Sequence, residues 1–401
     1  MMERKRRYRR FLFFCLALDF LAMGILGFQY FERKVPDEIY AEDVSKLNLK
    51  EKIACPFLEF DEAIEASAGN GYTIACNILG VIPFKEVKVT PSEKECVYAS
   101  GNVIGIYMET AGVLVIDSGE IIQEDGTVKK PSENIVAAGD YIVAFNGETI
   151  SSKQELMEQL KNLSNEVVTL QVKRGEKTLP LSIRPVKDAE GAYKLGIWVR
   201  DDTQGVGTLT FVDEQGHYGA LGHGISDVDT GELLQIDTGN LYGAQILAVN
   251  KGTAGSPGEL AGLIRYDDKN ILGTIEENTS CGIFGSLDSV ENGKLELKRL
   301  PIAYKQEMEE GNASILCTID KKVQEFAAEI ERIDMNHEDS NKSFVVKITD
   351  EELLEKTGGI IQGLSGSPVI QNGRIVGAVT HVLVNDPTRG YGIFIENMLE
   401  H

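Results

Sequence analysis

The chain has 401 residues, of which 42% are hydrophobic and 25% are charged. These proportions exclude a disordered or collagen-like chain, and the length predicts about two to three folded domains. The formal net charge is -22 although six of the 40 basic residues lie among the first ten. The chain after these ten residues is strongly acidic and repels phosphate backbones, so nucleic-acid binding is not expected. Because the six cysteines form no C-x-x-C pair and the five histidines no H-E-x-x-H motif, we expect no disulfide framework, metal or cofactor.

The N-terminus combines a basic tail with an apolar run. Met1–Arg10 is followed by Phe11–Phe28, 18 mostly apolar residues that are just long enough to cross a hydrocarbon core of ~30 Å as a helix. The arginines should remain in the cytoplasm, which places the rest of the chain outside it. A cleaved signal peptide is the alternative, although no small-residue cleavage site is evident. We therefore expect a membrane-anchored or secreted, extracytoplasmic protein.

Residues 98–186 have the pattern of a small α+β domain. Short β-rich runs flank a helix at Ser152–Leu163, which begins with Ser152 and Glu155 at capping-box spacing. With its phrase AAGDYIVAFNGETI at 137–150, this region resembles a PDZ domain. Such domains bind a peptide as an added strand at a sheet edge. The resemblance maps the carboxylate-binding loop onto Ile104, Gly105 and Ile106; a PDZ fold that serves only as a spacer or intramolecular clamp is the alternative.

Residues 187–401 are rich in glycine and in short β-rich runs, which predicts a β-barrel or sandwich. The strongest local signal is Asn372-Gly373 between two β-rich runs, which predicts a hairpin. Directly before it stands Gly363-Leu-Ser-Gly-Ser-Pro368. Glycines beside Ser365 permit a tight turn that exposes its hydroxyl and presents backbone N–H groups to an oxyanion.

This phrase resembles the nucleophile motif of chymotrypsin-like serine peptidases. The resemblance makes Ser365 the nucleophile and implies a trypsin-like barrel, with the N–H groups of Gly363 and Ser365 as the oxyanion hole. Ser367, which directly precedes a proline, is the alternative nucleophile.

A serine nucleophile needs a base. The strongest candidate is His223, which follows an apolar run and lies between two glycines. His217 is predicted to be exposed, and His381 to be a core histidine in a buried strand. The carboxylate that orients the base remains open on sequence grounds, with Asp350, Asp227, Asp229 and Asp237 as candidates.

The segments at 208–231, 251–260 and 363–399, together with the anchor and the PDZ-like region, resemble the stage IV sporulation protein B (SpoIVB) peptidases of endospore-forming bacteria. That resemblance implies a triad of His223, Asp350 and Ser365. It also implies secretion from the forespore into the space between its two membranes. There the peptidase would cleave a membrane-bound inhibitor, so that an intramembrane protease activates a late sigma factor, and would cleave itself.

Two other functions stay open, a non-catalytic PDZ adaptor and a quality-control protease of the HtrA kind. The expected fold is mainly β. Its expected parts are a basic tail and signal-anchor helix at 1–30, a linker and small β-rich region at 31–97, a PDZ domain at 98–186 and a peptidase barrel at 187–401.

Overall fold

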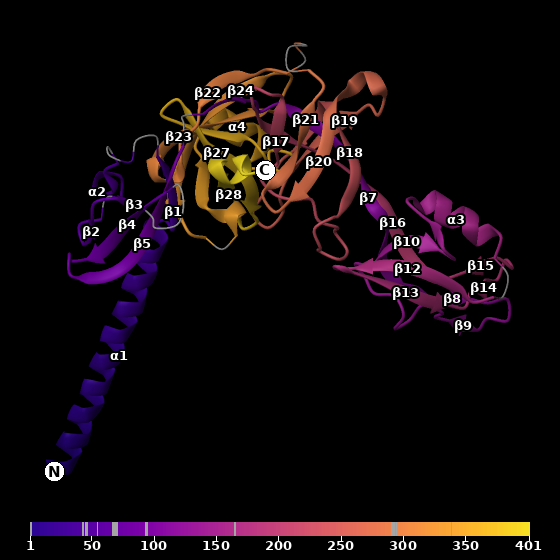
Figure 1. Ribbon diagram of the computed structural model, residues 1–401, viewed down its shortest axis with the longest axis horizontal. Helices are drawn as coiled ribbons and strands as arrows, with labels where there is room; N and C mark the ends of the chain where they lie inside the picture. Colours follow the sequence, from indigo (N-terminus) through magenta and orange to yellow (C-terminus); the bar gives the residue numbers. More distant parts are fainter. Residues whose placement is uncertain are drawn as a thin grey trace.

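The computed structural model describes residues 2–41, 44, 47–53, 55–65, 71–92, 95–163, 166–289, 293, 295–337 and 339–401. A long N-terminal helix leads into a small β-rich domain, a central body of two β-barrels and a PDZ domain that projects on the far side (Figure 1). The predicted fold class, mainly β with an anchor-like helix, a PDZ domain and a peptidase barrel, is confirmed.

The N-terminal helix and the small domain form one end of the molecule. Helix α1 (Met2–Lys34) extends beyond the predicted apolar run on both sides. The small domain, residues 35–92, has a sheet in the order β1-β5-β4-β2, with β3 paired to β4. Its elements are β1 (Glu38–Ala41), α2 (Leu49–Lys52), β2 (Leu58–Phe60), β3 (Ile64–Glu65), β4 (Tyr72–Ile78) and β5 (Ile82–Pro91). Apolar side chains that include Val35, Ile39, Leu58, Ile74 and Val87 form its buried core.

The first barrel is a ring of six strands. Its path runs β7-β18-β20-β21-β17-β16, and a further pairing of β7 with β16 closes it. These strands are β7 (Val103–Ser118), β16 (Ile197–Val212), β17 (His217–Ala220), β18 (Ile236–Asn250), β20 (Ile271–Thr279) and β21 (Gly282–Leu287). Three shorter strands extend the sheet: β6 (Cys96–Ala99), β19 (Glu259–Ile264) and β22 (Lys298–Pro301).

The second barrel is also closed, in the order β23-β24-β25-β28-β27-β26. Its elements are β23 (Gly311–Thr318), β24 (Val323–Ile333), β25 (Phe344–Ile348), α4 (Glu351–Thr357), β26 (Pro368–Gln371), β27 (Arg374–Leu383), β28 (Asp386–Phe394) and α5 (Ile395–Leu399). Short 3-10 helices lie at Asp268–Asn270, Lys305–Glu307 and Ser340–Lys342. The predicted hairpin is present, and Asn372 and Gly373 both have positive φ, 52° and 74°. Asn-Gly favours that turn because both residues tolerate left-handed backbone.

The PDZ domain contains β8 (Ile121–Ile122), β9 (Val128–Lys129), β10 (Tyr141–Phe145), β11 (Glu148–Thr149), α3 (Lys153–Lys161), β12 (Val168–Arg174), β13 (Lys177–Ile183), β14 (Val186–Lys187) and β15 (Tyr193–Lys194). Helix α3 has the predicted capping box between Ser152 and Glu155. The domain's sheet continues through β10 into the outer halves of β7 and β16.

The two 16-residue strands β7 and β16 therefore belong to two domains at once. They pair from Ser118↔Ile197 at the PDZ end to Val103↔Thr208 in the barrel. The predicted order of a PDZ block followed by a peptidase block is refined accordingly. The PDZ domain is an insertion within the first barrel, and the first half of β7, assigned above to the PDZ region, is a barrel strand. Strand β6 crosses the predicted boundary between residues 97 and 98 and extends the barrel sheet beside β16.

Candidate active site

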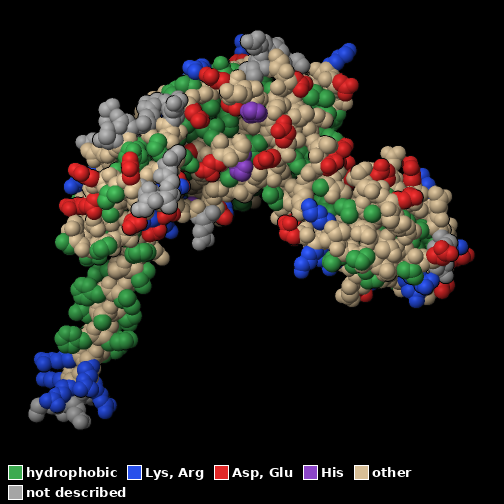
Figure 2. Space-filling view, in the orientation of Figure 1, with side chains coloured by type: hydrophobic (Ala, Val, Ile, Leu, Met, Phe, Trp, Pro, Cys, Tyr) green, Lys and Arg blue, Asp and Glu red, His purple; other side chains and the backbone are tan. Residues whose placement is uncertain are grey.

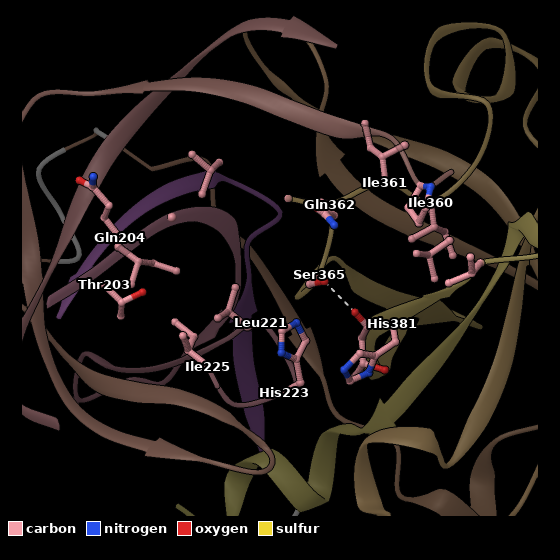
Figure 3. A pocket seen from close by; sticks show the side chains of 18 residues that line it. Thr203, Gln204, Leu221, His223, Ile225, Ile360, Ile361, Gln362, Ser365 and His381 are labelled. Atoms are coloured by element: carbon pink, nitrogen blue, oxygen red, sulfur yellow. Dashed lines mark hydrogen bonds between the residues drawn. The ribbon is translucent and has the colours of Figure 1, made fainter. Parts of the chain in front are cut away.

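A cavity of about 480 Å³ lies where the two barrels meet (Figure 3). The first barrel contributes Ile106, Leu221, His223 and Ile225, and the second contributes Ile360, Ile361, Ser365, Thr380, His381, Val382 and Val384. The structure thus brings the predicted nucleophile and the predicted base into one cavity, from opposite barrels.

The Gly363–Pro368 turn is held by two buried threonines of β16. The hydroxyl of Thr208 donates to the Gly363 carbonyl (2.8 Å), and that of Thr210 donates to the Gly366 carbonyl (2.8 Å). The backbone N–H of Thr208 donates to the Ser365 carbonyl at 3.0 Å. Only glycine suits position 366, because its φ is +94° and a Cβ there would lie 2.1 Å from the Thr208 carbonyl oxygen.

These contacts point the carbonyls of the turn toward β16. Within the described parts of the chain, no acceptor bonds the backbone N–H of Gly363 or of Ser365. Backbone N–H groups near a buried cavity are normally paired. Two unpaired N–H groups beside a serine hydroxyl are the donor set that an oxyanion needs.

Ser365 and His223 both line the cavity, but each side chain forms its hydrogen bond with a backbone carbonyl and not with the other. The Ser365 hydroxyl donates to the Thr380 carbonyl at 2.6 Å, the dashed contact in Figure 3. The Nδ1 of His223 lies 2.8 Å from the Gly224 carbonyl. Because a carbonyl only accepts, Nδ1 must carry the proton, which leaves Nε2 with its lone pair. Burial lowers the pKa of His223 and keeps the ring neutral.

The alternative nucleophile is enclosed. Ser367 is fully buried, and its hydroxyl donates to the Leu364 carbonyl at 2.7 Å. It does not line the cavity. The hydroxyl of Ser367 therefore closes the turn, while that of Ser365 reaches the cavity.

The prediction for His381 is wrong. Its side chain is exposed and lines the cavity, with its ring centroid 4.6 Å from that of His223. Desolvation and the neighbouring His223 lower the pKa of His381 to about 4. The strand position suggested a core residue, but the pairing of β27 with β28 has a register shift between Val379 and Val382, which includes His381. His217 is exposed as predicted, with Nδ1 2.9 Å from the Asp213 carboxylate.

In the part of the chain that the structure describes, no hydrogen bond or ion pair joins Asp350 to His223. Its Oδ1 accepts the backbone N–H groups of Glu352 (3.0 Å) and Leu353 (3.1 Å), and its Oδ2 accepts that of Ala327 at 3.3 Å. Asp350 is thus the N-cap of α4, and the expectation that it orients His223 is not met in this structure. The position next to Nδ1 is taken by the Gly224 carbonyl.

The three other acidic candidates are also elsewhere. Asp227 and Asp229 pair with Arg200 of β16, and Asp237 is exposed on β18. A sequence window cannot separate these roles, because an Asp before a short helix is equally suited to capping and to catalysis.

The predicted carboxylate-binding loop is wrong. Ile104, Gly105 and Ile106 lie inside β7, where β16 pairs with one edge and β18 with the other. Ile104 and Ile106 are buried in the core of the first barrel. No peptide strand can be added there, because both edges are occupied.

The open edge of the PDZ sheet is at the start of β16. Among the described strands, only β7 pairs with residues 197–204, and α3 lies beside this edge. The run Leu195-Gly196-Ile197 leads into it, and Gly196 has a φ of +64°. This second apolar-Gly-apolar run, followed by Trp198 and Val199, is the signal in the sequence that could have located the groove.

Comparisons with known proteins match two parts of the chain. The family model described as SpoIVB peptidase S55 matches residues 191–399, and a PDZ domain model matches residues 102–184. Two Xylella fastidiosa proteins described as candidate zinc metalloproteases are 28% identical over 92 residues, which is 22% of this chain. The chain spans about a fifth of the length of these curated relatives, 20%.

Two solved structures are similar to parts of the chain. The PDZ domain of the SdrC-like protein from Listeria monocytogenes is 25% identical, with a TM-score of 0.18, over 22% of this chain and 87% of that one. A protease from M. tuberculosis in its active form is 14% identical, with a TM-score of 0.24, over 49% of this chain and 74% of that one. By the family match over residues 191–399, the chain belongs to the SpoIVB peptidase S55 family and is a peptidase that contains a PDZ domain.

Proposed function

We propose that the protein is a serine endopeptidase in which Ser365 is the nucleophile and His223 the general base. The observation that carries this is the meeting of the two residues in one cavity, beside two backbone N–H groups without an acceptor in the described chain. The proposal requires one movement. The Ser365 hydroxyl must turn from the Thr380 carbonyl toward Nε2 of His223, a rotation about a single side-chain bond.

Each step of peptide-bond hydrolysis can then be assigned to a group in the cavity. Ser365 Oγ forms a bond to the carbonyl carbon of the peptide while its proton passes to Nε2 of His223. The N–H groups of Gly363 and Ser365 stabilise the oxyanion, and the C–N bond breaks as His223 returns the proton to the leaving amine. Water, activated by the same histidine, hydrolyses the acyl-enzyme. The Gly224 carbonyl holds the tautomer that this cycle needs.

The walls of the cavity favour an apolar substrate side chain. Ile360, Ile361, Val382 and Val384 come from the same barrel as Ser365, and Leu221 and Ile225 come from the other. The cavity lining in the described chain includes no Asp, Glu, Lys or Arg. A charged side chain would lose its hydration there without gaining a partner, so we propose cleavage next to apolar residues.

The family and the N-terminal helix suggest the biological setting. Residues 5–34 include a helix long and apolar enough to cross a membrane, and the basic tail precedes it. We propose that the two barrels lie outside the cytoplasm, in the space between the forespore membranes. There the peptidase would cleave a membrane-bound inhibitor in sporulation signalling, and itself. The PDZ domain would bind a peptide of the partner or of this chain along the open edge of β16.

The test is peptide cleavage by the purified full chain in detergent, read by mass spectrometry on a mixed peptide library. We expect cuts next to apolar residues, and Ser365→Ala should lower the rate on the order of 10^4-fold or more. Ser367→Ala is the matched control and should keep activity within about tenfold to a hundredfold, because it loses only a hydrogen bond within the turn. Cleavage that survives Ser365→Ala would refute the mechanism. A stable wild-type chain that cuts nothing but still binds peptide would favour the PDZ adaptor.

A further inference from the structure

One end of the small domain carries large apolar side chains that are exposed to solvent. The exposed fractions are 55% for Phe57, 62% for Leu79, 77% for Val81 and 54% for Ile82. They lie together, because the Leu79 N–H donates to the Phe57 carbonyl (2.8 Å) and β4 turns into β5 with Ile78 opposite Ile82. These four residues are called the apolar tip.

The backbone of the tip is unusual for its sequence. Leu79 and Gly80 both have positive φ, 55° and 70°, and the Val81 N–H donates back to the Ile78 carbonyl. A hairpin turn of this hand favours Asn-Gly, as at Asn372-Gly373 of this same chain. A leucine there is both conformationally unfavourable and exposed. The stability of the fold therefore does not explain a leucine at position 79. Residues whose type does not suit their backbone conformation tend to lie on functional surfaces.

The strand that follows the tip packs against the end of the apolar part of α1. The ring of Phe84, two residues after the tip, is 5.4 Å from the ring of Phe28 and 6.0 Å from that of Phe31. Phe28 is the last residue of the apolar run. In Figure 2 hydrophobic side chains continue from the helix onto the adjoining edge of the small domain.

Charged side chains lie next to the end of the apolar part of α1 and next to the turn of the tip. Lys85 bonds Glu32 at 2.9 Å and Asp37 at 2.6 Å, just beyond the apolar part of the helix. The carboxylate of Glu59 lies against Gly80, at the base of the turn. Exposed apolar side chains bordered by charged ones are typical of a surface that rests in the membrane interface.

We propose that the apolar tip inserts into the interfacial layer of the outer leaflet, next to the point where α1 leaves the bilayer. The proposal rests on the membrane anchoring proposed above. Its occupant is lipid, because the helix beside the tip is itself the membrane segment. A helix alone lets the body rotate about one axis, whereas helix and tip together fix the height and direction of the cleft above the membrane.

The test uses tryptophan fluorescence of the full chain in phosphatidylcholine vesicles that contain brominated acyl chains. The native Trp198 is first removed by Trp198→Phe. Single tryptophans are then introduced as Val81→Trp in the tip, Phe20→Trp in α1 and Val228→Trp, which replaces a side chain that is 85% exposed in the first barrel. We expect strong quenching for Phe20→Trp, quenching by about half for Val81→Trp, and none for Val228→Trp.

The outcomes separate the two proposals. If Phe20→Trp is quenched and Val81→Trp behaves like Val228→Trp, the tip proposal is overturned and the anchor stands. If neither is quenched, the anchor fails and the tip with it. A second variant guards against misfolding: Leu79→Asn should raise the melting temperature, because Asn suits the turn, and yet reduce the quenching of Val81→Trp. Unchanged quenching in Leu79→Asn would also count against the proposal.

Discussion

Ser365 and Ser367 stand two residues apart in one turn, and their hydroxyls have opposite surroundings. That of Ser365 opens to the cavity, and that of Ser367 is buried against the Leu364 carbonyl. The glycine pattern alone predicts that a hydroxyl is presented. The structure decides which one, because Gly366 turns the chain so sharply that its neighbours face opposite ways.

The two histidines of the cavity show what a local sequence pattern can and cannot predict about the position of a side chain. Flanking glycines predicted an accessible ring for His223, and His223 lines the cavity although burial lowers its pKa. His381 was misjudged because a bulge in β27 changes which face its side chain takes. Bulges depend on pairing partners that are distant in sequence, so a window of residues does not reveal them.

The low pKa of His381 predicts a pH-dependent stability. Its folded-state pKa of about 4 is below the value of 6.5 expected when unfolded, with desolvation and His223 as the main causes. The unfolded chain therefore binds the proton more readily. The contribution to stability is present above about pH 6.5 and is lost as the pH falls toward about 4.

His381→Asn removes this titration. We expect the melting temperature of the wild type to fall slightly more steeply between pH 7 and pH 4.5 than that of the variant, as measured by circular dichroism. The difference should be small because solvent reaches the exposed part of the ring. Lys342 and Asp339 also face His381, so Lys342→Gln is a useful control and should leave most of the difference in place. Equal slopes in wild type and His381→Asn would show that this ring is not desolvated.

At the scale of elements, β16 connects the PDZ groove to the candidate oxyanion hole. The strand begins at the open edge beside α3 and ends with Thr208 and Thr210 bound to the Gly363–Pro368 turn. Strand β7 pairs with β16 over most of this length, with register shifts between Trp198 and Val199 and between Arg200 and Asp202.

Thr208→Val tests the support of the turn. The change keeps the shape of the side chain and removes the hydroxyl that donates to the Gly363 carbonyl. We expect kcat to fall by about tenfold to a hundredfold with KM little changed, because the oxyanion donors lose their orientation. The stability loss should be about 1–2 kcal/mol in urea unfolding.

The matched control is Thr318→Val, which removes a similar buried hydroxyl bound to the Gly101 carbonyl at 2.9 Å, outside the cavity. It should cost the same stability and leave kcat unchanged. Equal losses of kcat in both variants would mean that the threonines act only through general stability.

At the scale of the whole molecule, the topology could not be predicted from the sequence. The strands, the Asn-Gly turns and the capping box are local, and the sequence predicts them well. The insertion of the PDZ domain into the first barrel depends on Val103–Ser118 pairing with Ile197–Val212, across more than 70 intervening residues. Ile104-Gly105-Ile106 and Leu195-Gly196-Ile197 have the same pattern, so only the pairing shows that the first is barrel and the second PDZ edge.

The placement of the groove gives a prediction for partner binding. Leu160 of α3, like Ile197 and Val199, is partly buried and packs against the core of the PDZ domain, while Met157 on the same helix is exposed. Leu160→Asp should weaken binding of extended apolar peptides by tenfold or more, measured by fluorescence polarisation, because a charge replaces the apolar contact. Met157→Asp should bind normally. Loss of binding in both, or in neither, would place the peptide elsewhere.

The central claim is that Ser365 attacks and His223 activates it, and the most direct measurement is the position of a covalent adduct. The full chain is treated with a fluorophosphonate, digested and mapped by mass spectrometry, with a melting curve for each variant. We expect the adduct on Ser365 in the wild type and in Ser367→Ala, no adduct in Ser365→Ala, and labelling slowed by at least about a hundredfold in His223→Ala. An adduct on Ser367, or full labelling of a folded His223→Ala protein, would contradict the account.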